Sequence, residues 1–146
     1  MEIDTPNRRD EAEIRKLIGD EANAICAKDV NRIMAHYVTD VIIFNVKPFQ
    51  IRGADAFRQV WETSLAYFPA SFETERRDLR IFVRGDLAIA HWFARFTGMG
   101  ADHPARSWLR NTVGDKRNGG KWQIVHGHCS IPFDPETSKA VFNLEP

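Results

Sequence analysis

Two histidines separated by one glycine, His126-Gly-His128, form a spacing that suits several kinds of chemistry. On a β-strand, side chains two positions apart point to the same face, so the two imidazoles would be neighbours. Such a pair ligates a metal when a third ligand lies close, exchanges protons, or donates hydrogen bonds across a protein interface. The spacing leaves all three interpretations open. We favour the interface, with no metal and no cofactor.

The two cysteines, Cys26 and Cys129, lie far apart in apolar surroundings and form no CxxC pair. Cys129 follows His128 directly, but adjacent residues of a strand point to opposite faces, so this histidine does not activate the thiol. We therefore predict two free, buried, unreactive thiols, and we expect a cytoplasmic protein.

Polar side chains interrupt otherwise apolar segments at two asparagines. Asn45 stands between Phe44 and Val46, and Asn111 stands between Arg110 and Thr112. A buried amide without a partner costs ~1–3 kcal/mol, so each amide should have a partner or face a cavity. Glu21 lies within a helical pattern, where its side chain points either to solvent or into a pocket.

The elements that position these groups follow from the apolar periodicity. Apolar residues at three- and four-residue steps predict helices, and β-branched and aromatic runs predict strands. The predicted helices span 10–28, 30–37 and 55–67, and the predicted strands span 41–46, 72–83, 87–97, 106–113 and 121–131. Helices first and then strands in series predict an α+β fold, with helices on one face of a mostly antiparallel sheet.

Strand alternation divides the last predicted hairpin into two faces. One face is rich in Trp, Arg and His, a composition typical of protein interfaces: Trp108, Arg110, Thr112, Trp122, Ile124, His126, His128 and Ser130. The other face is mostly apolar and suits the wall of a cavity: Leu109, Asn111, Val113, Val125, Gly127, Cys129 and Ile131. We expect the first face to form a homodimer through Trp108, Arg110, Trp122, His126 and His128.

The overall composition limits the class of protein. The chain has 146 residues, 20 basic and 20 acidic side chains, and 11% aromatic residues. Zero net charge argues against nucleic acid as a partner, and no apolar segment is long enough to span a membrane. We expect a single domain over 1–146, with a core at about 8–133 and a surface tail at 134–146.

The segment from Lys121 to Ser130, KWQIVHGHCS, preceded by Arg110-Asn-Thr112, resembles the SnoaL-like proteins of the nuclear transport factor 2-like (cystatin-like) superfamily. The same ending is similar to the association domain of calcium/calmodulin-dependent protein kinase II. This resemblance implies a cone: a strongly curved sheet wrapped over helices, with a pocket at the open end. It also implies a dimer that packs through the outer face of the sheet.

Ketosteroid isomerase belongs to the same superfamily, and the resemblance places its functional positions on this chain. Its general base falls on Asn45, and its two oxyanion-hole donors fall on Glu21 and Asn111. The pocket arginines of the association domains fall on Phe93, Val113 and Cys129. An amide has no basic pKa in the working range, so the chain lacks the isomerase base at position 45.

The resulting expectation is a mostly apolar cavity with a few polar groups. Its predicted lining is Asn45, Phe57, Trp61, Phe93, Asn111, Val125 and Cys129, with His91 as the catalytic acid–base group. The first functional hypothesis is a SnoaL-like protein that binds a small hydrophobic ligand, with isomerase, cyclase or hydrolase chemistry. The alternative is a non-catalytic dimerisation module of the same fold.

Overall fold

The computed structural model describes residues 5–100 and 103–146. Its helices are α1 (Thr5–Cys26), α2 (Val30–Met34), α3 (Ala54–Leu65) and the 3-10 turn η1 (Pro104–Arg106). Its strands are β1 (Tyr37–Phe44), β2 (Ile51–Arg52), β3 (Glu73–Arg84), β4 (Leu87–Thr97), β5 (Leu109–Asn118), β6 (Lys121–Ser130), β7 (Phe133–Asp134) and β8 (Lys139–Ala140). No helix within the described residues is long and apolar enough to cross a membrane.

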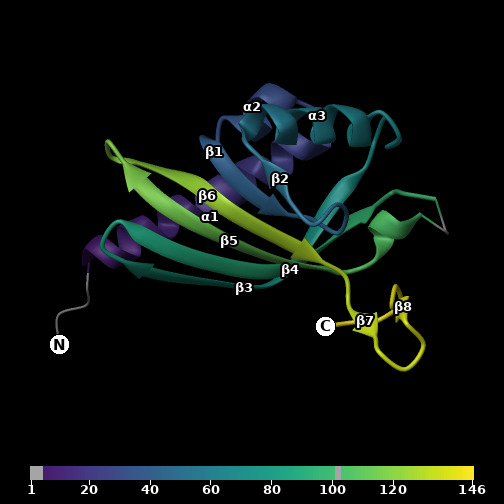
Figure 1. The fold of residues 1–146 in the computed structure, drawn as a ribbon. Helices are drawn as coiled ribbons and strands as arrows, with labels where there is room; N and C mark the ends of the chain where they lie inside the picture. Colours follow the sequence, from purple (N-terminus) through teal and green to yellow (C-terminus); the bar gives the residue numbers. More distant parts are fainter. Residues whose placement is uncertain (1–4, 101–102) are drawn as a thin grey trace.

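Six strands form one curved sheet in the order β2-β1-β6-β5-β4-β3 (Figure 1). All neighbours are antiparallel except β1 and β6, which run parallel. Hairpins join β3 to β4 and β5 to β6, as the short turns after Arg84 and Asn118 require. The predicted α+β class and the nuclear transport factor 2-like architecture are confirmed.

Helix α1 packs on the inner face of the sheet against β3 and β6, and α3 packs against β1 (Figure 1). The apolar stripe of α1 buries Ile14, Leu17, Ile18 and Ile25 completely or nearly so. The sheet contributes buried side chains to the same core: Val41, Ile43, Ala88, Ala90 and Ile124. The helices therefore cover one end of the inner face of the sheet, and a cavity remains at the other end.

A bulge in β6 changes which residues of the last hairpin share a face. Gly114 pairs with His126, but the next residue, Asp115, pairs with Ile124, so Val125 is an extra residue in β6. The inward positions are therefore Trp122 and Ile124 before the bulge and Gly127 after it. Uninterrupted alternation placed Trp122 on the outer, dimer-forming face, and that prediction was wrong.

Trp122 is instead 4% exposed and belongs to the core, where its indole Nε1 donates to Asp10 Oδ1 at 3.3 Å. Arg117 Nη1 approaches the same carboxylate oxygen at 2.6 Å, and its guanidinium lies 5.2 Å from the Trp122 ring. A buried carboxylate needs such partners, since an unpaired charge inside the protein is costly. This cluster ties α1 to the β5–β6 hairpin.

Trp108 lies on the outer face but is also covered by the chain itself. It is 7% exposed, and the guanidinium groups of Arg77 and Arg95 lie 4.5 and 4.7 Å from its ring. Its indole Nε1 donates to Glu145 Oε2 of the C-terminal segment at 3.1 Å. Trp108 is therefore not available to a partner, which corrects the predicted interface at a second position.

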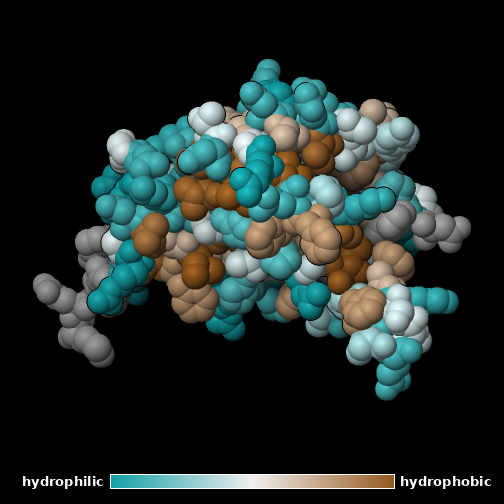
Figure 2. All heavy atoms as spheres, in the orientation of Figure 1, coloured by the Kyte–Doolittle hydropathy of each residue, from teal (hydrophilic) through white to brown (hydrophobic). Residues whose placement is uncertain are grey.

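The rest of the outer face carries exposed apolar side chains among polar ones. Phe44, Phe82, Leu87 and Ile89 are 40–60% exposed, and Arg110 and His128 are also exposed there. Figure 2 shows apolar and hydrophilic atoms interleaved over the strands. Phe82 and Ile89 are paired across β3 and β4, and neighbouring exposed apolar side chains favour a face that contacts another surface.

Candidate functional site

A cavity of about 550 Å³ lies between α1, α3 and the inner face of the sheet. This volume suits a small organic molecule. Aromatic and aliphatic side chains form most of its wall, among them Ile18, Tyr37, Ile43, Phe57, Val60, Trp61, Trp92, Phe96, Leu109 and Val113. Polar and thiol side chains also line it: Glu21, Asn23, Asn45, Thr74, Glu75, Arg76, Arg95, Asn111, Thr112, His128 and Cys129.

The structure brings five of the predicted cavity residues together on this wall: Asn45, Phe57, Trp61, Asn111 and Cys129. They come from the loop that follows β1, from α3, and from the β5–β6 hairpin. Phe57 packs edge-on against Tyr37 with ring centroids 5.1 Å apart and leans on Trp61 at 5.9 Å. These rings line the cavity rather than fill it.

Three predicted site residues lie elsewhere. His91 and Phe93 occupy outward positions of β4, because Ala88 and Ala90 are the buried residues and Trp92 is the one that faces the cavity. His91 is exposed and stacks on Phe82 with centroids 6.0 Å apart. Val125 is the bulged residue of β6 and is absent from the wall. The acid–base role predicted for His91 therefore has no basis in the cavity.

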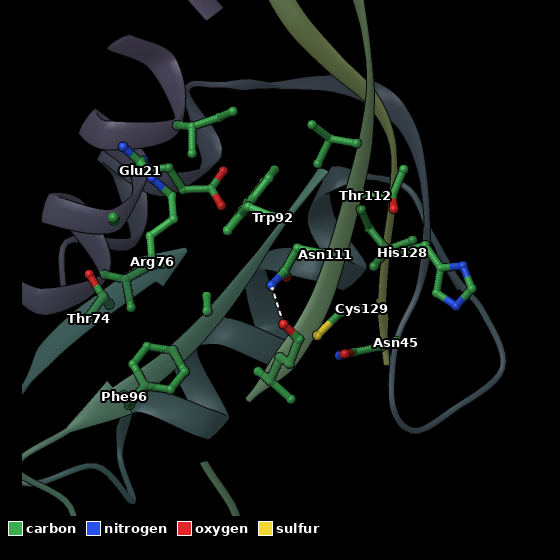
Figure 3. Close-up of a pocket in the computed structure, with 18 of the residues that line it drawn as sticks. Glu21, Asn45, Thr74, Arg76, Trp92, Phe96, Asn111, Thr112, His128 and Cys129 are labelled. Atoms are coloured by element: carbon green, nitrogen blue, oxygen red, sulfur yellow. Dashed lines mark hydrogen bonds between the residues drawn. The ribbon is translucent and has the colours of Figure 1, made fainter. Parts of the chain in front are cut away.

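Glu21 supplies a titratable group that His91 does not. It projects from α1 into the space between the helix and the strands, opposite Trp92 (Figure 3). Its Oε2 is buried and has no hydrogen-bond partner within the described residues. The pKa of Glu21 is raised from 4.5 to about 7, and burial is the largest cause. A hydrogen bond with Tyr37 lowers this pKa, and the charge of Asp115 raises it by a smaller amount.

Asp115 lies behind the cavity wall on the inner face of β5. It is 1% exposed, and neither carboxyl oxygen has a hydrogen-bond partner within the described residues. Burial raises the pKa of Asp115 from 3.8 to about 7. Burial and the charge of Glu21 hold the pKa of Tyr37 well above 10, so its hydroxyl keeps its proton. Two carboxyl groups and one phenol thus form a buried acidic cluster.

Two side chains with hydrogen-bond donors, Asn111 and Trp61, also line the cavity. Asn111 Nδ2 donates to the Leu109 carbonyl over a long 3.4 Å (Figure 3), and the buried indole Nε1 of Trp61 has no partner within the described residues. Asn45 uses its Oδ1 to accept from the Val46 backbone N–H at 2.9 Å. An oxygen atom of a ligand would accept hydrogen bonds from these donors, because buried polar groups are normally hydrogen-bonded.

Cys129 contributes volume rather than a nucleophile. Burial raises the pKa of its thiol to about 11, so it stays protonated at neutral pH.

His126 and His128 pack edge-on against Phe44, with ring centroids 4.8 and 5.8 Å away. Across 5–100 and 103–146, no three side chains of metal-binding type gather in one place.

Comparison of this chain with known proteins agrees with the fold described above. Residues 14–134 match the SnoaL-like domain. The chain belongs to the SnoaL-like family. A similar solved structure is an NTF2-like protein of unknown function from Pseudomonas putida KT2440. It is 38% identical, with a TM-score of 0.87 over 95% of this chain and 98% of that one. No curated protein shows significant similarity.

Two more distant structures share the SnoaL-like fold. One is described as a putative scytalone dehydratase from Novosphingobium aromaticivorans, 15% identical, with a TM-score of 0.70 over 84% of each chain. The other is described as a calcium/calmodulin-dependent protein kinase type II association domain from Thiobacillus denitrificans, 18% identical, with a TM-score of 0.68 over 81% of this chain and 93% of that one. At these identities the likeness concerns the fold alone.

In this SnoaL-like domain, the sequence left the side chain of Glu21 open between solvent and a pocket, and it gave no indication of Asp115. Glu21 follows Ile14, Leu17 and Ile18 at helical spacing, so it falls on the buried stripe of α1, and that signal was available. Asp115 lies in a polar run, 114–120, which reads as a turn. The structure continues β5 to Asn118, so the strand carries Asp115 inward. No sequence signal we used distinguishes this strand end from a turn.

Proposed function

We propose that this SnoaL-like protein is an acid–base enzyme that binds a small, mostly apolar molecule carrying a carbonyl or hydroxyl group. The observation that carries the proposal is Glu21, a buried carboxyl group with one oxygen unpartnered on the wall of a 550 Å³ aromatic cavity. A general base or acid works best when its pKa lies near the working pH, and the pKa of Glu21 is about 7.

The chemistry that fits these groups is proton transfer next to a carbonyl. The Glu21 carboxylate takes a proton from the carbon beside the carbonyl, and the electron pair of that C–H bond moves to form an enolate. The Nδ2 of Asn111 and the Nε1 of Trp61 are donors on the wall of the same cavity and would bind its oxygen. Glu21 then returns the proton to another carbon, which is an isomerisation, or to a departing hydroxyl, which leaves as water.

Two further observations support this class of reaction. Cys129 is held as a thiol, His91 lies on the opposite face, and the ring of His128 packs against Phe44, so Glu21 is the buried acid–base group of the cavity wall with a pKa near neutrality. A protein of the same fold is described as a scytalone dehydratase, and loss of water is one of the two outcomes above. The free thiols Cys26 and Cys129 fit a reducing, cytoplasmic compartment.

Hydrogen–deuterium exchange of a probe ketone tests this proposal without knowledge of the natural substrate. Wild-type protein should accelerate exchange of the protons beside the carbonyl of 1-tetralone in D2O, followed by NMR, and the rate should rise as pH passes through about 7. Glu21→Gln should abolish the acceleration, and the exposed control Glu62→Gln should not. Equal rates for wild type and Glu21→Gln would overturn the proposal.

We also propose that a second copy of the chain covers the outer face of the sheet. The support is the exposed apolar group Phe44, Phe82, Leu87 and Ile89, beside Arg110, His126 and His128. A two-fold axis lets one such patch cover its own copy. Ile89→Asp should halve the mass in sedimentation velocity, and Phe49→Asp, which changes an apolar residue that is 98% exposed outside the sheet, should not. An unchanged mass for Ile89→Asp would locate the contact elsewhere.

This second proposal also holds for the alternative function, a non-catalytic dimerisation module. The two functions differ in the cavity. A pure association module needs no buried carboxyl group beside an empty space of this size, and Glu21→Gln would leave its behaviour unchanged. The exchange experiment therefore separates the two hypotheses, and the sedimentation experiment does not.

A further inference from the structure

One basic side chain in the wall of the cavity stands apart from its neighbours. Arg76 lies at an inward position of β3, opposite Ala94 of β4, and rises toward α1 (Figure 3). The space around it is open, because Ala94 is small and Gly19 of α1, on the same wall, has no side chain. Nothing lies within 4 Å of the position where a Cβ of residue 19 would stand.

Arg76 differs from the nearby arginines in its partners. Arg77 and Arg95 contact Glu75 and Glu145 at 2.8–3.6 Å. Arg76 makes no hydrogen bond or ion pair within residues 5–100 and 103–146. The charge that acts on it is that of Arg15 on α1, and partial burial and this like charge lower the pKa of Arg76. The charges of Arg15 and Arg76 thus act on one another, and no acidic side chain within these residues pairs with Arg76.

An anion at this place would remove both costs. Two like charges without a counterion repel one another, and a guanidinium group taken partly out of water loses hydration. A carboxylate removes both the repulsion and the loss of hydration, since it carries the opposite charge and accepts two parallel hydrogen bonds from one guanidinium. The rest of the cavity, from Trp92 and Phe96 inward to Phe57, is aromatic and suits the apolar body of the same molecule.

We propose that the ligand of the cavity is an aromatic or apolar carboxylic acid, whose carboxylate binds Arg76 and Arg15 while its body extends toward Glu21. This inference rests on the proposed function and adds the class of ligand to it. It uses none of the positions 93, 113 and 129, on which the arginines of the association domains fall. The carboxylate and the reacting centre of the ligand would then both lie in this one cavity.

A matched pair of probes tests this inference. 2-Naphthoate and 2-naphthol share one ring system, and at pH 7 only the first is an anion. Isothermal titration calorimetry should show that wild-type protein binds 2-naphthoate about tenfold more tightly than 2-naphthol, which is about 1.4 kcal/mol. Arg76→Met should remove this preference while leaving the affinity for 2-naphthol unchanged, and Arg15→Met should reduce the preference.

The control variant is Arg80→Met on the same strand. Arg80 is exposed and pairs with His91 on the outer face, so its replacement should change neither affinity. If both probes bind equally to wild type, or if Arg76→Met leaves the preference intact, the inference is wrong and the cavity still binds small molecules. If neither probe binds a protein with a normal unfolding transition, both the inference and the proposed function fail.

Discussion

Replacement of Glu21 by glutamine should make the protein more stable at alkaline pH while leaving its stability at acid pH nearly unchanged. Folding raises the pKa of Glu21 from 4.5 to about 7, so the folded chain holds a proton that the unfolded chain releases between these values. The stability associated with this proton is fully present below pH 4.5 and is lost as the pH rises through about 7. A shift of this size corresponds to about 3 kcal/mol.

Urea unfolding followed by circular dichroism at pH 4.5, 7 and 8.5 measures this effect. Glu21→Gln keeps an oxygen that accepts from Tyr37, and it cannot ionise. Relative to wild type, the variant should gain about 3 kcal/mol between pH 4.5 and pH 8.5, or roughly 6–12 °C in Tm. Glu62→Gln on the exposed side of α3 should run parallel to wild type. Parallel curves for Glu21→Gln as well would refute the claim that this carboxyl group is buried.

Three further predictions concern other buried groups. Asp115→Asn should lower the midpoint of the pH dependence of ketone exchange, because the charge of Asp115 raises the pKa of Glu21; an unchanged midpoint would mean that the two groups are not coupled. Asp10→Ala should destabilise the protein by about 2 kcal/mol in urea unfolding, because the buried indole N–H of Trp122 then loses its acceptor, while Arg117 keeps its ion pair with Asp86; a loss below about 1 kcal/mol would contradict the buried contact. Cys129 should resist N-ethylmaleimide at pH 8 in the folded protein and react in urea, as mass spectrometry would show, because burial raises its pKa to about 11; rapid labelling of the folded protein would count against this burial.

The sequence was sufficient for the order of the elements and for the cavity residues on unbroken strands and helices. Asn111 on β5 and Trp61 on α3 follow from simple periodicity, which fails only where the backbone departs from it. The bulge at Val125 is such a departure, and it moved Trp122 from the expected outer face into the core. A bulge depends on how two strands register, and the sequence of one strand does not display this.

The error on β4 has a different physical cause. Its inward residues, Ala88 and Ala90, are smaller than its outward residues, Leu87 and Ile89, so the size of the apolar side chains does not show which face of β4 is buried. Phe93 was assigned to the cavity at a position that the resemblance marks, and His91, which shares its face of the strand, followed it with the predicted catalytic role. Only the position of α1 over the sheet distinguishes the two assignments.

The parallel pairing of β1 with β6 determines when the cavity can come into existence. Phe44 of β1 pairs with His128 of β6, so a ribosome must add more than eighty residues before β1 receives its second neighbour. Because synthesis adds about 5–20 residues per second, the apolar edge of β1 stays unpaired beside α1 for several seconds. Contacts so distant along the chain also slow spontaneous folding. Nascent chains that end before β6 should therefore bind chaperones that recognise exposed apolar segments, and release them once β6 has emerged.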